Sequence, residues 1–236
     1  EISHVIRGED HISNTPKQIM LYQAMGLKVP KFAHLPLILD PDGGRMSKRT
    51  GATAVSEYKN LGFLPEAIVN YLLLLGWSPG ENQEKISLAS AIKKFSIKKV
   101  NKSGAAFSLD KLKWLNQQYI KEMPVERLAE QLEPFLKERG WIGENEDNRR
   151  LQDIIKLYKS RMATLADFLE RAAYIFTDDF SRDPDIQQQA FTVEQKKSFE
   201  QLAGRLDKAE DFSVKGTEEV FRAVVAELGI SADQLV

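Results

Sequence analysis

The sequence has no cysteine among its 236 residues, so it can form neither disulfides nor thiolate metal sites. Histidine is also scarce, with only His4, His11 and His34 present. None of the three lies four residues from another, which is the spacing of zinc ligands on one helix face. We therefore expect no protein-bound metal, and the lack of cysteine is consistent with a reducing compartment.

Long apolar runs are absent as well, whereas a membrane-spanning helix needs about 18 consecutive apolar residues. No signal or transit peptide is evident, so we expect a cytoplasmic protein with no membrane contact. The composition, 42% hydrophobic and 28% charged, is typical of a globular protein. Because the sequence starts at Glu1 without an initiator methionine, we expect it to be a piece of a longer chain.

The net charge of −1 hides an asymmetry along the chain. Residues 1–121 carry 17 Lys/Arg against 10 Asp/Glu, and residues 122–236 carry 16 against 24. The excess of positive charge lies in residues 93–121, where aromatic residues are interleaved with eight lysines. Such a stretch can bind nucleic acid locally, but composition alone favours a solvated lysine face.

The first part of the sequence predicts a strand, a helix and a second strand. Residues 2–8 and 32–40 are short apolar runs, and the helix between them is predicted to begin with Thr15 as its N-cap and to end at Gly26. This order is a fragment of an α/β sheet, in which ligands bind at the carboxyl ends of the strands. A glycine-rich loop follows the second strand.

The remainder of the sequence predicts helices, so the fold class is mainly α. Helix starts are indicated at Pro65, Ser87 and Ser108, and Thr192 with Gln195 forms a capping box. From about residue 125 onward nothing alternates with period two. Apolar stripes at helical spacing are formed by Leu128, Leu132, Phe135 and Leu136, and by Leu151, Ile154, Ile155, Tyr158, Met162 and Leu165.

The loop PDGGRMSKRTGA, residues 41–52, combines glycines with a cationic cluster. Glycines let such a loop change shape, a lysine ammonium suits phosphate oxygens, and arginine can bind phosphate with two hydrogen bonds. A loop of this kind can close over a nucleotide and stabilise the charge of a leaving pyrophosphate. Residue types alone leave a solvated surface loop as the alternative.

The segment RMSKR within this loop resembles the KMSKS-type signature of class I aminoacyl-tRNA synthetases. HVIRGEDHISNTPKQIMLYQAMG, followed by PKFAHLPLILDPDGGRMSKRTGA, resembles the glutamyl-tRNA synthetase family. The resemblance continues through GFLPEAIVNYLLLLGWS and FSLDKLKWLNQQYI to the end of the chain. The departure at Arg45, where the signature usually has lysine, keeps the positive charge.

The resemblance implies an AMP-forming glutamate–tRNA ligase that joins L-glutamate to ATP and then transfers it to the 3′ end of tRNA(Glu). ATP would arrive with Mg²⁺, and a monomer is expected. Within the motif loop Arg45, Met46, Ser47, Lys48 and Arg49, Lys48 would neutralise the triphosphate and the departing pyrophosphate. Arg45 would support it, and Ser47 would brace the loop.

The same resemblance assigns residues to the substrates. Arg7 would bind the glutamate substrate, and its alternative role is a structural salt bridge with Glu9 or Asp10. Leu37 and Ile38 would contact the adenine of ATP. Their alternative role is to form part of a buried strand, and the two roles are compatible. The residues implied around ATP are Asp10, His11, Leu37, Ile38 and Lys48.

Three regions are implied: residues 1–52 are the end of a Rossmann-type catalytic domain, residues 53–124 a helical stem-contact domain, and residues 125–236 an anticodon-binding region. The last resembles the all-helical region of bacterial glutamyl enzymes, whereas glutaminyl enzymes have β-barrels there. Arg161 matches an arginine that reads the last anticodon base in some members, and an exposed helix arginine is the alternative. The lysines implied in backbone contacts with tRNA are Lys102, Lys111 and Lys113.

The family's catalytic domain also needs a HIGH motif, which this sequence does not contain. We therefore expect the chain to be inactive alone, and we expect a short stretch beyond Val236 to be missing relative to the family. Two other functions are less consistent with the sequence. A non-catalytic RNA-binding protein would not need the RMSKR loop, and a tRNA-modifying paralogue would lack the helical anticodon region.

Overall fold

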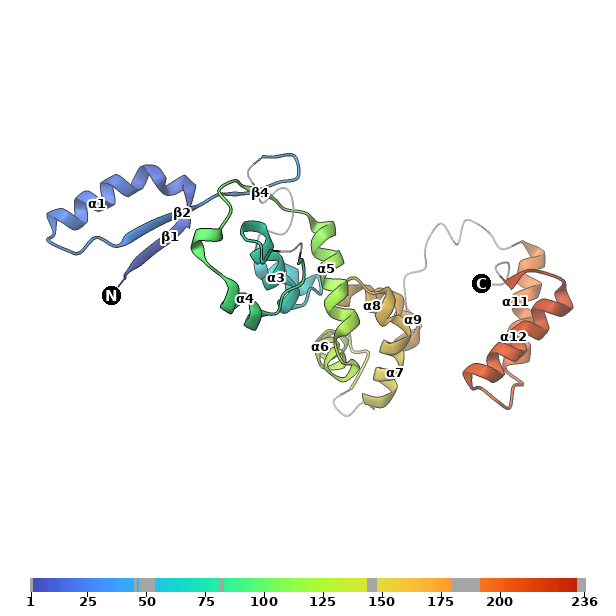
Figure 1. Cartoon of the computed structure of the whole chain (residues 1–236). Coiled ribbons are helices and arrows are strands. Elements are labelled where there is room, and N and C mark those ends of the chain that lie inside the picture. Colours follow the sequence, from blue (N-terminus) through green and yellow to red (C-terminus); the bar gives the residue numbers. More distant parts are fainter. Residues whose placement is uncertain are drawn as a thin grey trace. The chain divides into compact units, whose positions relative to one another are not determined.

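The computed structural model describes residues 2–44, 46, 54–80, 83–143, 148–179 and 192–232. The chain forms two compact units, Glu1–Asp179 and Phe180–Val236 (Figure 1). The predicted functional boundaries at residues 52 and 124 both fall inside the first unit, and they stay a prediction. No helix in the described ranges is both long and apolar enough to cross a membrane.

The first unit begins with the predicted strand, helix and strand (Figure 1). The elements are β1 (His4–Gly8), the 3-10 helix η1 (Glu9–Asn14), α1 (Thr15–Ala24) and β2 (Lys31–Leu35). Strands β1 and β2 pair in parallel, with Arg7 opposite His34. Gly26, with a φ of 64°, terminates α1 as predicted, since the Leu27 N–H reaches back to the Tyr22 carbonyl at 2.8 Å.

The prediction that Thr15 caps α1 is wrong. Thr15 is already the first residue of the helix, because η1 runs directly into α1 and the Thr15 N–H bonds the Ile12 carbonyl. Its hydroxyl is used differently: it accepts a hydrogen bond of 2.8 Å from Arg7 and lies 3.0 Å from Nε2 of His34. Thr15 therefore orients side chains of β1 and β2 instead of satisfying a helix end.

The single strand predicted over residues 32–40 is also wrong. The segment divides at Pro36 into β2 and β3 (Ile38–Leu39), and β3 pairs in parallel with β4 (Ala105–Ala106) in a separate sheet. Proline has no N–H for the β2 ladder, so pairing stops there. The chain thus passes from one small sheet to another just before the glycine-rich loop.

Apart from β4, the regular elements in the rest of the described first unit are helices, as predicted. The Ser87 and Ser108 caps are confirmed, each accepting a backbone N–H at 3.2 Å, from Ser90 and Lys111. Other described elements are α2 (Val55–Asn60), α3 (Pro65–Gly76), α4 (Leu88–Lys94), η2 (Ile97–Lys99), α5 (Leu109–Glu122), α6 (Val125–Glu138), α7 (Asn148–Tyr158), η3 (Lys159–Arg161), α8 (Leu165–Arg171) and α9 (Ala173–Phe176).

The apolar stripe predicted over residues 151–165 is buried, except for the partly buried Tyr158, but it does not lie on one helix. Helix α7 ends at Tyr158, η3 follows, and α8 begins at Leu165. Thr164 and Asp167 form a capping box, which starts a new helix at this point. The stripe therefore turns a corner, and Met162 at that corner is fully buried.

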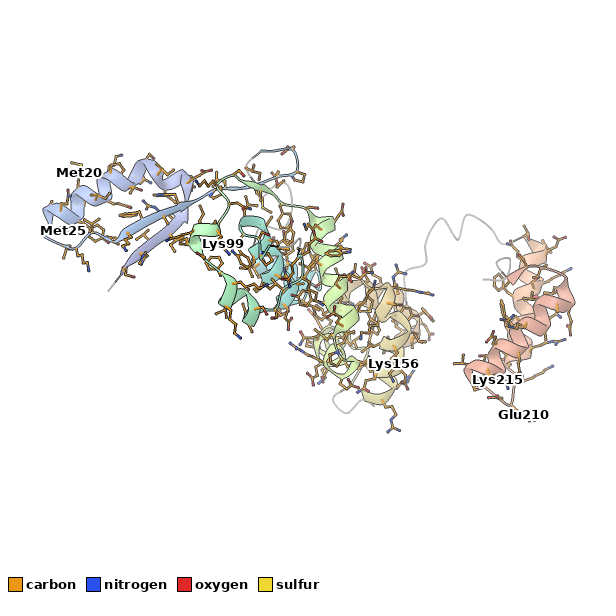
Figure 2. All side chains as sticks on the ribbon, in the orientation of Figure 1. Met20, Met25, Lys99, Lys156, Glu210 and Lys215 are labelled. Atoms are coloured by element: carbon orange, nitrogen blue, oxygen red, sulfur yellow. The ribbon has the colours of Figure 1, made fainter. Side chains whose placement is uncertain are left out.

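Two large hydrophobic clusters, and a small one of Trp77, Ile86 and Ala91, hold the described helices of the first unit together. Helices α5 to α8 contribute most of the larger cluster, which includes Leu128, Leu132, Leu136, Ile155 and Phe168. Helices α2, α3 and α5 contribute to the second one, with Tyr58, Phe63, Tyr71, Leu112 and Leu115. In contrast, Met20 on α1 and Met25 at its end are 68% and 61% exposed (Figure 2).

The second unit contains α11 (Val193–Leu206) and α12 (Val214–Leu228). The predicted Thr192–Gln195 capping box is confirmed. Ser213 caps the start of α12 and Gly229, in the left-handed region, ends it. Arg205 of α11 donates to Glu227 of α12 at 2.7 Å, so the pair is joined at its surface.

Candidate functional site

Arg7 is held at the carboxyl end of β1 by neutral groups. Its guanidinium donates to the Thr15 hydroxyl at 2.8 Å and to the His11 carbonyl at 3.3 Å, and it lies 5.4 Å from the centre of the Phe32 ring. Nε lies 3.4 Å from Nε2 of His34. Within the described part of the chain no carboxylate pairs with Arg7, so the proposed structural salt bridge with its acidic neighbours is not formed.

The two residues predicted to contact ATP from η1 follow directly after this strand. Asp10 folds back over Gly8, because a Cβ placed on Gly8 would lie 2.6 Å from Oδ1 of Asp10 and 3.6 Å from Cδ2 of Leu37. The Leu37 N–H also donates to Glu9 at 3.4 Å. Asp10 and Leu37 are therefore brought together at the end of β1, and exposed His11 follows Asp10 in the chain.

Leu37 and Ile38 lie where the chain crosses between the two small sheets. Gly104, which precedes β4, contacts this crossing closely: a Cβ there would lie 2.7 Å from the Leu37 carbonyl oxygen. Ile38 pairs with Ala105 and is 38% exposed, so it is not the buried strand residue of the alternative reading. Gly104 was not among the predicted site residues, although a glycine before a strand is a signal for close backbone approach.

The first turn of the motif loop is tightly folded. Asp40 donates its N–H to the Gly44 carbonyl at 2.7 Å, Gly43 donates to Asp40 at 2.8 Å, and Met46 donates to Ile38 at 3.3 Å. Gly43 has a φ of 86°, a conformation that favours glycine. The loop therefore leaves from β3 itself. Arg45, Ser47, Lys48 and Arg49 lie outside the described residues, and their roles stay predictions.

The structure does not gather the three predicted RNA-binding lysines on one face. Lys111 forms an ion pair with Glu84 at 2.9 Å. Lys113 is two positions further along α5, and residues with this spacing do not face each other on a helix. Lys102 lies in the turn before β4, and both it and Lys113 are exposed. Lys99 of η2, in the same basic stretch, is exposed as well (Figure 2).

Arg161 is exposed at the corner between α7 and α8, so it is not a residue in the middle of a helix. The hydroxyls of Tyr158 and Tyr174 lie 2.7 Å apart near this corner. Burial, followed by the contact with Tyr174, raises the pKa of Tyr158 to about 12, and the positive charges of Arg161 and Arg171 oppose the rise. Sequence reasoning missed Tyr174 and Arg171 as neighbours of Tyr158, because only the corner brings α8 and α9 near the end of α7.

Two further features of the described residues bear on the site. Within the described ranges no group of three or more His, Asp or Glu side chains could hold a metal ion. A cleft of about 680 Å³ lies among α2, α3 and α6, and its lining includes Lys59, Phe63, Phe135 and Leu165. None of the predicted site residues lines it.

Two family models match nearly the whole chain between them. Residues 1–114 match a model described as tRNA synthetases class I (E and Q), catalytic domain. Residues 127–236 match a model described as anticodon binding domain.

Individual relatives agree along the full chain. The glutamate–tRNA ligase of Geobacter sulfurreducens is 45% identical over 99% of this chain and 50% of its own length. That of Desulforudis audaxviator is 41% identical over 100% of this chain and 48% of its own length. A crystal structure of a glutamate tRNA ligase from Elizabethkingia meningosepticum, in complex with its amino acid, has a TM-score of 0.77 and 32% identity over 99% of this chain and 49% of its own. The chain spans about half the length of the curated relatives it matches.

Proposed function

Because the chain belongs to the class I glutamyl-tRNA synthetase family, we propose that it is part of an enzyme that activates L-glutamate with ATP and transfers it to tRNA(Glu). One observation carries the proposal: the likeness to glutamate–tRNA ligases runs through both the catalytic-domain match and the anticodon-domain match. From α6 onward the described residues form helices and no strand, which also supports glutamyl over glutaminyl identity, because glutaminyl enzymes have β-barrels in that region.

The first half of the reaction takes place at the β1–β3 end. A glutamate carboxylate attacks the α-phosphorus of ATP, which forms glutamyl-adenylate and releases pyrophosphate. Lys48, supported by Arg45, neutralises the phosphates, and Ser47 braces the loop. Asp10, His11, Leu37 and Ile38 contact the adenosine of ATP, whose Mg²⁺ arrives with the nucleotide.

Arg7 binds the other carboxylate of the glutamate substrate. This role is supported by its surroundings, because neutral partners hold the guanidinium in place and leave its charge for an acidic ligand. In the second half of the reaction, a ribose hydroxyl at the 3′ end of tRNA attacks the adenylate carbonyl, which forms the ester and releases AMP.

The helical part of the chain binds the tRNA. Lys102 and Lys113 contact phosphates, and Lys111 does so only after it leaves Glu84. Such contacts set the register of the RNA on the protein and carry no base specificity. Arg161 contacts the last anticodon base, and its exposed position at the corner suits a base that is splayed out of its stack.

Aminoacylation by the full-length enzyme tests this function. We expect charging of tRNA(Glu) with glutamate, and we expect Arg161→Ala to lower the preference over tRNA(Gln) by about 10- to 100-fold, the usual range for loss of one base contact. Arg171→Ala is the control, because it lies near the same tyrosine pair and should leave the preference unchanged. Charging with a different amino acid would refute the assignment.

The chain by itself provides a second test. Without the other half of the ATP site, it should give no ATP–pyrophosphate exchange above the blank. Exchange by the chain alone would contradict the proposed division of the ATP site.

A further inference from the structure

Three hydrogen bonds join segments of the first unit that are far apart in sequence. The Leu165 N–H donates to the Gly62 carbonyl at 2.9 Å, and the Leu64 N–H donates to Oδ1 of Asn116 at 2.8 Å. Nδ2 of Asn116 donates to the Ala163 carbonyl at 2.6 Å. Together they form a joint between the α2–α3 link, the middle of α5, and the corner between η3 and α8.

Gly62 makes this joint close. Its φ of 78° ends α2, and a Cβ at this position would lie 2.6 Å from the Ala166 nitrogen and 2.8 Å from the Leu165 nitrogen. Backbone atoms at that distance cannot be moved aside by a side-chain rotation. The first N–H of α8, which has no partner within its own helix, is satisfied by the Gly62 carbonyl.

Asn116 is the centre of the joint, and it is fully buried. One side-chain amide satisfies a backbone N–H from one segment and a backbone carbonyl from another, so both groups lose their partner if the amide is removed. A buried polar group left without a partner is costly, which ties the positions of the two segments to α5.

One side of the joint leads to the anticodon-reading residue. Arg161 is exposed at the end of η3, Met162 is fully buried, and the next residue is Ala163, whose carbonyl accepts the bond from Asn116. Arg161 is therefore only two residues away from the carbonyl that Asn116 binds. A bound base that displaces Arg161 would pull on this hydrogen bond. Element η3 also contacts α5 directly.

The other side leads to the motif loop by two routes. Helix α2 precedes Gly62, and it begins at Val55, shortly after the RMSKR segment. Helix α5 is the second route: Phe107, just before it, donates to the Leu39 carbonyl at 2.8 Å, and Leu39 belongs to β3. The loop leaves from β3, where Met46 donates to Ile38. In Figure 1, α5 runs between β4 and α8.

We propose that Asn116, seated against Gly62, is a positioning residue that transmits the binding of the last anticodon base at Arg161 to the ATP-binding motif loop. It touches neither RNA nor nucleotide. It acts by holding the η3–α8 corner, α5 and the end of α2 in one arrangement. The proposal rests on the proposed function.

The test is a double-mutant cycle in the full-length enzyme. One change is Asn116→Ala, and the other is a substitution of the last base of the tRNA(Glu) anticodon. In the unmodified enzyme we expect the base change to lower kcat by about 10-fold or more, in addition to weakening tRNA binding. In Asn116→Ala we expect the effect on kcat to shrink to about threefold or less. The effect of the base change on the dissociation constant should remain, because Arg161 still binds the base.

Asn70→Ala is the matched control. Asn70 is buried like Asn116 and makes the same kind of bridge, accepting from the Ile86 N–H at 2.8 Å and donating to the Glu84 carbonyl at 3.0 Å. The Tyr119 hydroxyl of α5 also donates to Oδ1 of Asn70 at 2.8 Å, and none of these hydrogen bonds involves the η3–α8 corner. A merely structural loss would affect both variants alike, so Asn70→Ala should keep the full effect of the base change on kcat.

Several outcomes would decide whether Asn116 has this positioning role. The proposal is overturned if Asn116→Ala keeps the full base effect on kcat, if Asn70→Ala loses it equally, or if the unmodified enzyme shows the effect in binding alone. Should Asn116→Ala fail to fold, Asn116→Asp keeps the acceptor toward Leu64 and removes the donor toward Ala163, and it is judged by the same criteria. Failure of the unmodified enzyme to charge any tRNA would instead refute the proposed function.

Discussion

Gly62→Ala should strongly destabilise the first unit, for two separable reasons. The left-handed backbone costs a residue with a Cβ about 1 kcal/mol relative to glycine. In addition, the new Cβ would collide with backbone nitrogens at 2.6 and 2.8 Å, so the end of α2 and the start of α8 must separate. Their hydrogen bond is then lost and leaves a buried donor without a partner, which costs a further 1–3 kcal/mol roughly.

Gly140→Ala carries the first effect alone, so the difference between the two variants gives the second. Gly140 follows α6 with a φ of 68°, but a Cβ there would meet nothing within 4 Å. We therefore expect Gly140→Ala to lower the free energy of unfolding by about 1 kcal/mol and Gly62→Ala to lower it by about 2–4 kcal/mol.

Urea unfolding followed by tryptophan fluorescence measures both variants. Trp77, Trp114 and Trp141 are the only tryptophans of the chain, and all three belong to the first unit, so the signal reports on that unit alone. Equal destabilisation by the two substitutions would refute the reasoning, because it would show that the contact between α2 and α8 contributes nothing.

Two further predictions concern charge. In tRNA-binding titrations between 50 and 200 mM salt, the slope of log K against log salt concentration reports the number of phosphate contacts. Lys102→Ala and Lys113→Ala should each reduce this slope by the equivalent of about one contact. Lys111→Ala should reduce the slope less, because Lys111 must break its ion pair with Glu84 before it can bind a phosphate. Equal slopes for all three variants would argue against this difference. Burial raises the pKa of Tyr158 from 10.0 to about 12, so its neutral hydroxyl contributes stability that is complete below pH 10 and is lost as the pH rises toward 12. Tyr158→Phe should therefore reduce the fall in Tm between pH 10 and 12, and an unchanged fall would contradict that account.

Local signals in the sequence located most of the helices. Ser87, Ser108 and the Thr192–Gln195 pair cap the helices predicted from them, since a cap depends on residues within one turn. Local signals failed where a neighbouring segment competed for the same groups. Thr15 has the residue type of a cap, but η1 already satisfies its N–H and Arg7 uses its hydroxyl.

For the candidate site too, some features were predictable from the sequence and others only from the structure. The likeness of residues 4–52 to a family pointed to Arg7, Asp10, Leu37 and the motif loop, because those residues lie within continuous segments of sequence. Periodicity cannot show contacts between distant segments. The structure was needed to identify the partners of Arg7 and the ion pair between Lys111 and Glu84.

The sequence by itself determined the mainly helical fold, several helix ends and the family, because periodicity, caps and signature residues are read over a few neighbouring positions. Only the tertiary structure decided that Pro36 sends the chain into a second sheet and that Gly62, Asn116 and Ala163 meet at one joint. The physical reason is that a buried amide or a close backbone approach depends on partners 47 or 52 positions away, and no local pattern encodes their distance.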